Sequence, residues 1–402
     1  MAGSGPAEQV VVAGYARTPF GRFGGALRGV RLPVLGAVAV RAAVARSGVE
    51  PAAVAELAVG VNFPGSERSV ARQVQLRSGI PEDRSAYTVD RACCSSLAAV
   101  ALASRGLRLG DTAVAVAGGV DNLSRVPYFL ETARFGSRLG DLQLTDQLVV
   151  ACPHSGVPRA VQAAVEAGQY GVDRVEQDEW AVRSQERYQL ALAAGRLDAE
   201  LVPVDAPDAE GGPVLLDRDE VPRPRTTLAA LSALPTVNGS TTVTAGNAPD
   251  LSSGASALVL TSGAWAREQR VPVRAQLSGF AMASGDPQQI ASMPARAARL
   301  ALRRAGLDLS GVDLLEVNEA FAAVPLVTTL ELADRDQHRA EHLRERTNVG
   351  GGAIAVGHPT GATAGRLVMT LVSQLTARGG GTGLVTICGG VGEAEAVVVR
   401  VG

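Results

Sequence analysis

The sequence Val89-Asp90-Arg91-Ala92-Cys93-Cys94-Ser95-Ser96 decides the fold, because an extended run changes here into a helix. Residues 85–90 form a short strand, and apolar residues recur at helical spacing from residue 95 to residue 107. Cys93 therefore precedes or opens the first helical turn. A thiol at this position faces unpaired backbone N–H groups and the positive end of the helix dipole, which both favour the thiolate. The stretch predicts a nucleophilic cysteine. The alternative is that Cys93 and Cys94 are small buried residues at a tight junction.

The composition is typical of a protein with a large buried interior. The chain has 402 residues, of which 46% are hydrophobic. It is long enough for about two or three domains, or for two half-domains that share one core. Its 38 basic and 40 acidic residues give a net charge of −2, so no overall field attracts nucleic acid or an anionic membrane. Every basic residue is arginine, which excludes Schiff-base chemistry on lysine.

The cysteines indicate a reducing compartment. Disulfide-stapled secreted domains are short and rich in cysteine, whereas this long chain has four, at Cys93, Cys94, Cys152 and Cys388. None lies in a Cys/His pattern suited to zinc, so we expect no metal. Residues 1–8 lack the pattern of a signal peptide, and no apolar run approaches the ~20 residues that span a bilayer. We expect a cytoplasmic protein that binds neither nucleic acid nor membrane.

Strands and helices alternate along the chain, which predicts an α/β fold with a parallel or mixed sheet covered by helices. The expected strands are 9–14, 54–61, 85–90, 112–117, 256–261, 273–283, 312–317, 384–387 and 394–401. The expected helices are 34–47, 69–78, 95–107, 159–167, 177–194, 295–305, 321–332 and 364–378. The rhythm occurs twice, which indicates an internal duplication. The more polar region from 121 to 240 is typical of an insertion.

Three further segments follow predicted buried strands, where open α/β sheets place their sites. They are Asn318-Glu319-Ala320-Phe321, the glycine-rich loop 350–359 that presents His358, and Cys388-Gly389-Gly390. One histidine or one glycine run is weak support for a site. Four loops that supply Cys, Asn, His and Cys in one chain favour a shared active site.

Together these segments resemble the motifs of the thiolase family, which includes acetyl-CoA acetyltransferases and 3-ketoacyl-CoA thiolases. The resemblance runs in order over nearly the whole chain, through residues 17–25, 90–96, 117–124, 243–248, 318–321, 357–359 and 388–390. It implies two duplicated βαβαβαββ half-domains that form a five-layered α-β-α-β-α core with an inserted loop domain. The boundaries would be 1–121 with 250–270 for the first half-domain, 122–249 for the loop domain and 271–402 for the second half-domain.

The resemblance also implies a role for each motif residue. Cys93 would be acylated by a thioester. His358 would take the Cys93 proton and, with a water held by Asn318, stabilise the enolate of the second thioester. Cys388 would be the acid and base at the α-carbon. The backbone N–H groups of Cys93 and Gly390 would form a second oxyanion hole.

The residues expected at the substrate match the family less well. Pro249 replaces a serine after Ala248, and His154-Ser155-Gly156 is only a partial match to a pantetheine motif. Arg223 could stack on a nucleotide or pair with it, and Phe321 is also expected at the substrate. Coenzyme A or acyl-CoA would be a substrate, with no permanently bound cofactor. One explanation of these departures is sequence drift in an enzyme that still uses CoA thioesters. The other is an unusual substrate, either an acyl-carrier-protein thioester or a thioester from specialised metabolism of the fatty acid or polyketide type.

The resemblance therefore predicts an acyltransferase that condenses acyl thioesters in a Claisen reaction, or cleaves a 3-oxoacyl-CoA in reverse, through an acyl-Cys93 enzyme. The direction stays open because the same groups serve both. A non-catalytic protein that binds thioesters or a partner enzyme is an alternative, although such proteins lose catalytic residues that are present here. A decarboxylating ketosynthase is disfavoured by Cys388. The family implies a homo-oligomer, either a dimer or a tetramer.

Overall fold

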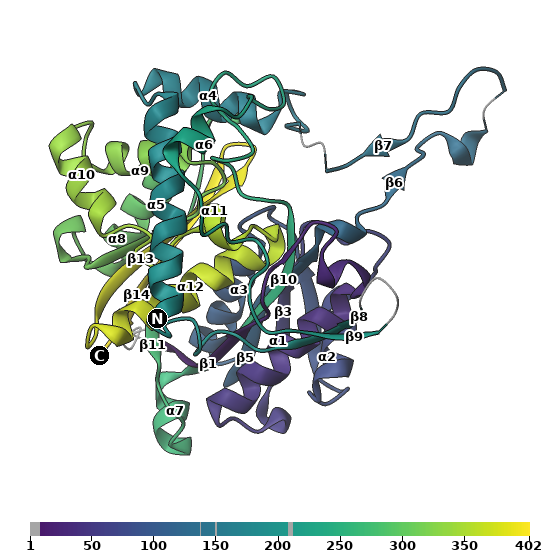
Figure 1. The fold of residues 1–402 in the computed structure, drawn as a ribbon. Coiled ribbons are helices and arrows are strands. Elements are labelled where there is room, and N and C mark those ends of the chain that lie inside the picture. The colour runs from purple at the N-terminus through teal and green to yellow at the C-terminus, as the bar shows by residue number, and fades with distance from the viewer. Residues whose placement is uncertain (1–8, 137, 149–150, 208–211) are drawn as a thin grey trace.

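The computed structural model describes residues 9–136, 138–148, 151–207 and 212–402. They form a ten-stranded mixed sheet in the order β12-β13-β14-β11-β1-β10-β5-β3-β4, with β2 paired to β10 (Figure 1). The strands are β1 (Val10–Arg17), β2 (Gly21–Arg22), β3 (Glu56–Gly60), β4 (Ser85–Val89), β5 (Val114–Asn122), β10 (Ser252–Ser262), β11 (Ala275–Ser284), β12 (Leu314–Val317), β13 (Gly381–Gly390) and β14 (Glu393–Val401).

Two halves of this sheet repeat the same pairing pattern. In the first, β3 runs parallel to β5, which pairs antiparallel with β10, and β10 pairs antiparallel with β1. In the second, β12 runs parallel to β13, which pairs antiparallel with β14, and β14 pairs antiparallel with β11. The halves are joined where β1 pairs with β11, from Val10 opposite Leu277 to Val12 opposite Ala275. The repeated pairing is the internal duplication that the sequence rhythm indicates.

Helices on both faces make five layers. The outer helices α1 (Leu32–Ser47) and α2 (Val70–Ser78) cover the first half of the sheet, and α8 (Met293–Ala305) covers the second. The middle layer consists of α3 (Ser95–Leu109) and α12 (Thr360–Ala377), which pack against each other and against strands of both halves. Every residue of α12 from Gly361 to Leu375 is buried. The predicted five-layered α/β core is confirmed.

Helix α3 is unusually apolar because it lies in the middle layer of the fold. With the turn before it, residues 92–109 are long and apolar enough to cross a membrane by length and composition alone. We expected no run near that length. Most of this segment is buried inside the protein, because α3 lies between two halves of a sheet. Its apolar composition is therefore accounted for by packing.

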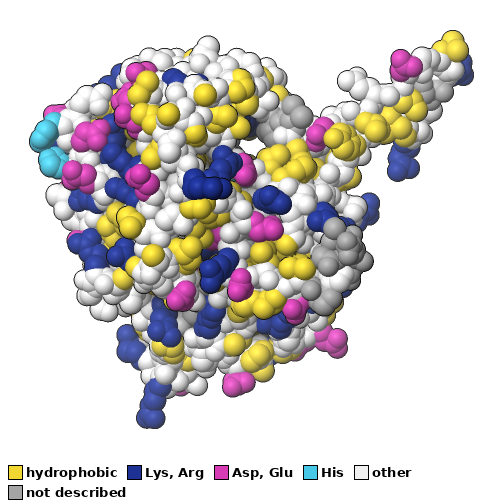
Figure 2. Space-filling model, viewed as in Figure 1, with side chains coloured by type: hydrophobic (Ala, Val, Ile, Leu, Met, Phe, Trp, Pro, Cys, Tyr) yellow, Lys and Arg dark blue, Asp and Glu magenta, His cyan; other side chains and the backbone are white. Residues whose placement is uncertain are grey.

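The segment between β5 and β10 carries its own elements. They are β6 (Tyr128–Phe129), β7 (Thr145–Asp146), α4 (Arg159–Gln169), α5 (Arg174–Ala193), β8 (Val204–Pro207), β9 (Pro213–Leu216) and α6 (Leu228–Ser232). The strands β6 and β7 pair in an arm that projects from the rest of the molecule (Figures 1 and 2). The arm exposes several large apolar side chains, namely Tyr128, Phe135, Leu139, Leu142 and Leu144. The predicted domain boundaries themselves stay predictions.

Some helices were not expected. They are α6, α7 (Gly263–Gln269), α10 (Gln337–Glu345) and α11 (Ala353–Val356). The helix predicted at 321–332 is present as α9 (Ala323–Leu332), which begins two residues after the predicted start. Helix α10 escapes a search for apolar periodicity because only Ala340, Leu343 and Arg344 are buried. Its start is marked instead by Asp336, whose side chain accepts a hydrogen bond from the Arg339 N–H.

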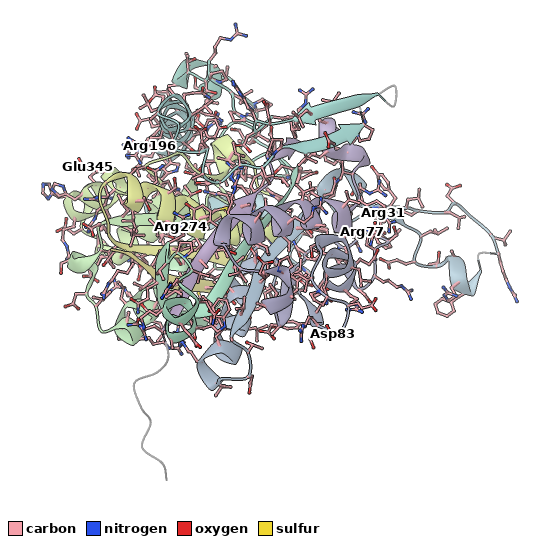
Figure 3. All side chains as sticks on the ribbon, turned by 90° about the horizontal axis from the view of Figure 1, so that it is seen from below. Arg31, Arg77, Asp83, Arg196, Arg274 and Glu345 are labelled. Carbon is pink, nitrogen blue, oxygen red and sulfur yellow. The ribbon has the colours of Figure 1, made fainter. Side chains whose placement is uncertain are left out.

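Charged side chains lie mainly on the outside. Arg31, Arg77 and Arg274, which are labelled in Figure 3, are all exposed. Both signs of charge are interspersed on the face drawn in Figure 2. This mixture agrees with the near-zero net charge.

The close approach of β5 to the start of α12 can be tested at Gly119. A Cβ on Gly119 would lie 1.9 Å from the Gly361 carbonyl oxygen, so Gly119→Ala must push the two elements apart. We expect a loss of at least about 1–3 kcal/mol of stability, measured as a lower Tm. The control is Gly168→Ala in α4, where a Cβ meets nothing within 4 Å. It should raise stability by up to about 1 kcal/mol. An unchanged Tm for Gly119→Ala would contradict the packing.

Candidate active site

Cys93 lies on a tight turn between β4 and α3. The preceding residue, Ala92, has φ of 49°, a left-handed conformation that costs a non-glycine residue about 1 kcal/mol or more. Side chains on either side hold the turn. Asp90 accepts a hydrogen bond from the Ala92 N–H at 3.0 Å, and the Ser95 hydroxyl accepts one from the Arg91 N–H at 2.9 Å. The strained backbone therefore presents Cys93 at a defined position.

His358 lies beside this thiol and precedes α12 as Cys93 precedes α3. Its Nε2 is 3.2 Å from the Cys93 Sγ, although the two residues are 265 positions apart in the chain. Its Nδ1 is 2.7 Å from the Thr363 hydroxyl, which donates its own proton to the Pro359 carbonyl. Thr363 can then only accept, so the neutral imidazole carries its proton on Nδ1. Nε2 is left as the acceptor for the Cys93 thiol.

Burial determines the charge of this pair. It raises the pKa of the Cys93 thiol well above its ordinary value; nearby Cys388 adds to the rise, and the Arg159 guanidinium opposes it. Burial, with a contribution from the Arg366 charge, lowers the pKa of His358 to about 3. The pair therefore rests as a thiol and a neutral imidazole. The prediction that the helix N-terminus favours a thiolate was wrong in its net result, because desolvation outweighs the helix dipole.

Cys388 completes the group of reactive side chains. It is buried at the end of β13, opposite Ala394 of β14. Burial raises the pKa of its thiol to about 12, and the charge of Arg159 again opposes the rise. Two residues later Gly390, with φ of 66°, starts the turn into β14. Cys388 is therefore a thiol at neutral pH.

The segment after β12 supplies an amide. The Asn318 Nδ2 lies 3.4 Å from the His358 Nε2, and among the described residues its buried Oδ1 has no hydrogen-bond partner. The next residue, Glu319, is fully buried and accepts four hydrogen bonds, from Trp180, Ser184, Asn348 and the Ile354 N–H. This network joins the Asn318 segment to the loop that leads to His358. It leaves Asn318 Oδ1 available to a molecule in the site.

Several positioning residues were not identified from the sequence. The Ser252 hydroxyl accepts from the His358 N–H at 2.6 Å, and the Ser96 hydroxyl accepts from the Gly365 N–H at 2.9 Å. Asp121 accepts from Thr360 and from the Gly361 N–H. Asp121 and Ser96 lie inside motifs that were recognised. Their partners in α12, however, lie more than 230 residues away in the chain, and no local pattern links them.

The residues predicted to bind the substrate make few contacts with Cys93, His358 and Cys388. Ala248 and Phe321 pack against the hydrophobic cluster that contains Cys388. Pro249 follows, half-buried. Arg223 forms an ion pair with Asp250 and donates to the Ala245 carbonyl, so its guanidinium is already engaged. His154 is exposed and makes no contact with Cys93, His358 or Cys388 among the interactions of the described residues.

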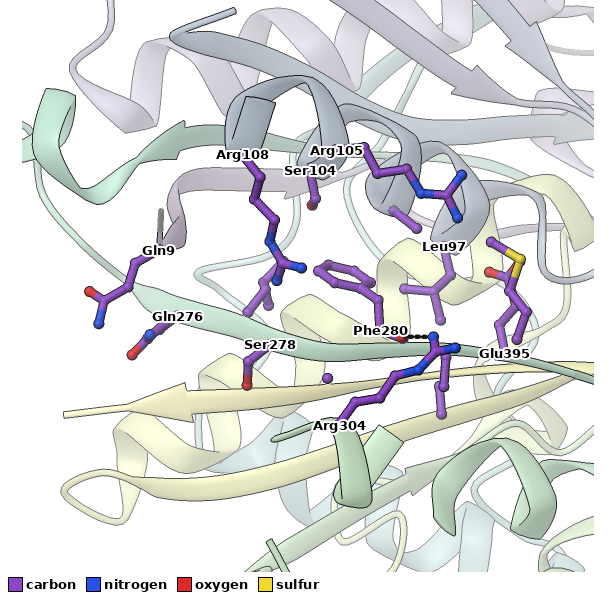
Figure 4. Close-up of a pocket in the computed structure, with 16 residues that line it drawn as sticks. Gln9, Leu97, Ser104, Arg105, Arg108, Gln276, Ser278, Phe280, Arg304 and Glu395 are labelled. Carbon is purple, nitrogen blue, oxygen red and sulfur yellow. Dashed lines mark hydrogen bonds between the residues drawn. The ribbon is translucent and has the colours of Figure 1, made fainter. Parts of the chain in front are cut away.

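Among the described residues, no group of three or more His, Cys, Asp or Glu side chains could hold a metal ion. A cavity of about 520 Å³ lies between α3 and β11 and is lined by Arg105, Arg108, Phe280 and Arg304, among others (Figure 4). Neither Cys93, His358 nor Cys388 lines it. The reactive group is therefore separate from this cavity.

Known proteins share both the sequence and this fold. The family model of the thiolase N-terminal domain matches residues 10–264, and that of the thiolase C-terminal domain matches residues 271–401. An acetyl-CoA acetyltransferase of Cupriavidus necator is 38% identical over 96% of this chain and 98% of its own length. A beta-ketoadipyl-CoA thiolase of Pseudomonas aeruginosa is 39% identical over 98% of this chain and 99% of its own. The crystal structure of the Bacillus anthracis acetyl-CoA acetyltransferase superposes with a TM-score of 0.94 at 34% identity, covering 99% of this chain and all of that one. The chain belongs to the thiolase family.

Proposed function

We propose that this thiolase-family acyltransferase transfers acyl groups between CoA thioesters through an acyl-enzyme on Cys93. The observation that supports the proposal is the 3.2 Å contact between the Cys93 Sγ and the unprotonated Nε2 of a neutral His358. A nucleophile whose proton has an acceptor in hydrogen-bond reach is the arrangement that covalent acyl transfer requires. The related acetyl-CoA acetyltransferases and the beta-ketoadipyl-CoA thiolase support CoA thioesters as the substrates.

Acylation begins from the neutral pair. Cys93 gives its proton to His358 Nε2 and attacks the thioester carbonyl, while the N–H groups of Cys93 and Gly390 stabilise the oxyanion. The carbon–sulfur bond to CoA breaks. The leaving CoA thiolate takes the proton of Cys388 and departs as a thiol. Acyl-Cys93 is left beside a Cys388 thiolate and a protonated His358, so the buried site remains neutral overall.

The second half of the reaction uses both charges. The Cys388 thiolate removes the α-proton of a second acyl-CoA, and protonated His358 with Asn318 stabilises the enolate oxygen. The enolate carbon attacks the acyl carbonyl, a carbon–carbon bond forms, and Cys93 leaves as a thiolate that regains its proton from His358. Each group returns to its resting state. Cleavage follows the same steps in reverse, and the resting Cys388 thiol then protonates the enolate that is released.

Intact mass spectrometry after exposure to acetyl-CoA tests the proposal. We expect one acetyl group on the wild-type protein and none on Cys93→Ala, because Cys93 is the only nucleophile in this scheme. Cys388→Ala should still be acetylated, but its condensation rate should fall by about 10²–10⁴-fold because it lacks the base.

The control is Cys152→Ser, which removes a thiol on the segment before α4 and should be labelled like the wild type. Acetylation of Cys93→Ala, or a wild type that is labelled neither by acetyl-CoA nor by carrier-protein thioesters, would refute the acyl-enzyme. Labelling by carrier-protein thioesters but not by acetyl-CoA would show that the carrier is a protein.

The role of Thr363 gives a second test. Thr363→Val removes the acceptor of the Nδ1 proton, so His358 loses the contact that keeps Nε2 free for Cys93. Leaving a buried donor unpaired costs enough to slow acylation by about tenfold or more. Thr363→Ser keeps the hydroxyl and should restore most of the rate, measured as the burst of free CoA. Equal rates for the Val and Ser variants would contradict this role.

We further infer that the chain forms a homodimer through β4. This strand ends the sheet, and its second edge is unpaired among the described strands. Exposed strand edges pair readily with another strand, and β4 carries the half-buried Tyr87 and Val89. The apolar side chains of the projecting arm would suit a contact between two such dimers.

Light scattering measures this directly. We expect a mass of two or four chains of 41.2 kDa. A monomer at micromolar concentration would exclude the proposed pairing of β4.

A further inference from the structure

Arg159 places a positive charge beside the two reactive sulfurs. It is the first residue of α4, and its side chain reaches the turn that follows Cys388. A Cβ on Gly390 would lie 3.0 Å from the Arg159 Nη2 and 3.3 Å from its Cζ, so the guanidinium packs directly on Gly390. Its charge also opposes the rise in the pKa of both Cys93 and Cys388. The guanidinium therefore lies within electrostatic reach of the acyl-transfer chemistry.

The charge of Arg159 has no carboxylate partner among the described residues. The only hydrogen bond found there for its guanidinium runs from Nη1 to the Gln162 Oε1, at 3.0 Å. Buried arginines elsewhere pair with acids, as Arg17 does with Glu200 and Asp219. The nearest acid on α4, Glu166, is already used by the backbone N–H groups of residues 290–292.

A neutral side chain holds the guanidinium in place. Gln162 is buried, and its amide group donates to the Gln288 Oε1 at 2.9 Å and to the Pro287 carbonyl at 3.3 Å. Its oxygen is thereby aimed at Arg159. A half-buried guanidinium that is oriented by an amide and lacks a counter-charge is suited to bind an anion.

The position of the charge identifies which part of a substrate carries that anion. In an acyl-CoA the phosphates lie at the far end of the pantetheine arm, away from the thioester that reaches Cys93. An anion beside the sulfurs therefore belongs to the acyl group. A carboxylate is the common acyl anion, and it matches the guanidinium with two parallel hydrogen bonds.

We propose that Arg159 is a specificity residue that binds the carboxylate of a dicarboxylic acyl thioester while its other end acylates Cys93. This inference rests on the proposed acyl-enzyme and adds the class of acyl group. Succinyl-CoA and butyryl-CoA are the matched probes, because both have four-carbon acyl chains and only the first carries a terminal carboxylate.

The experiment compares kcat/KM for Cys93 acylation by the two probes, measured from the release of free CoA. The wild type should prefer succinyl-CoA by about tenfold or more, which is the usual effect of a hydrogen bond to a charged group. In Arg159→Gln the ratio should fall by about tenfold or more, and Arg159→Lys should retain part of the preference. Because both rates come from one preparation, loss of folded protein lowers them equally and leaves the ratio unchanged.

The matched control is Arg267→Gln on α7, an exposed arginine whose loss should leave the ratio at the wild-type value. If butyryl-CoA acylates Cys93 and the ratio does not respond to Arg159→Gln, the role of Arg159 is refuted and the acyl-enzyme stands. If neither thioester acylates Cys93 while acetyl-CoA does, the inference fails and the acyl-enzyme stands. If acetyl-CoA also leaves Cys93 unlabelled, the inference and transfer from CoA thioesters both fail.

Discussion

The start of α3 meets the start of α12 in the middle layer, and the whole site depends on this contact. Each helix comes from one half of the duplicated sheet, and each follows a loop that presents one reactive side chain. The Ser96 hydroxyl joins the two helices, and Asp121 holds α12 to the end of β5. Cys93 and His358 meet because the two halves pack with these helices face to face.

A second constraint is the low polarity of the place where they meet. Burial keeps both thiols and the imidazole uncharged at rest. Separated charges then arise only when a thioester has entered and its carbonyl can take up the electrons. Hydrogen bonds offset the free energy lost when polar groups are removed from water. Glu319, for example, is buried and accepts four hydrogen bonds. The free site is therefore uncharged, and its thiols and imidazole become charged only in pairs of opposite sign during the reaction.

Most of the fold could be predicted because its elements carry strong local patterns. Strand patterns identified β5 and β14, and helical spacing identified α3 and α8. The bounds agree within two residues except at the end of β5, which runs five residues past the predicted end at 117. The loop with Cys93 could be found because a helical pattern begins directly after it, although β4 before it is only partly buried. The loops with Asn318, His358 and Cys388 could be found because each follows a predicted buried strand or a glycine-rich turn. Helix α10 was missed because its exposed face is polar and only three of its residues are buried.

The remaining features depend on distances that no local pattern encodes. The thiolate expected at Cys93 was a local argument from the helix dipole, and burial by distant elements reversed it. Arg159 gave no signal, since an arginine at the start of a helix is ordinary. Its position beside the site is visible only in the folded protein, where its guanidinium packs against Gly390. Gly390 lies 231 residues further along the chain.

The arginine-only surface has a chemical consequence for a protein that handles thioesters. Acyl-CoA molecules acylate free amines spontaneously, and lysine side chains are the usual targets. A guanidinium stays protonated and has no free electron pair to attack a carbonyl. The chain has no lysine, so it has no side-chain amine that acyl-CoA could acylate. Its positive side chains therefore keep their charge during long exposure to acyl-CoA.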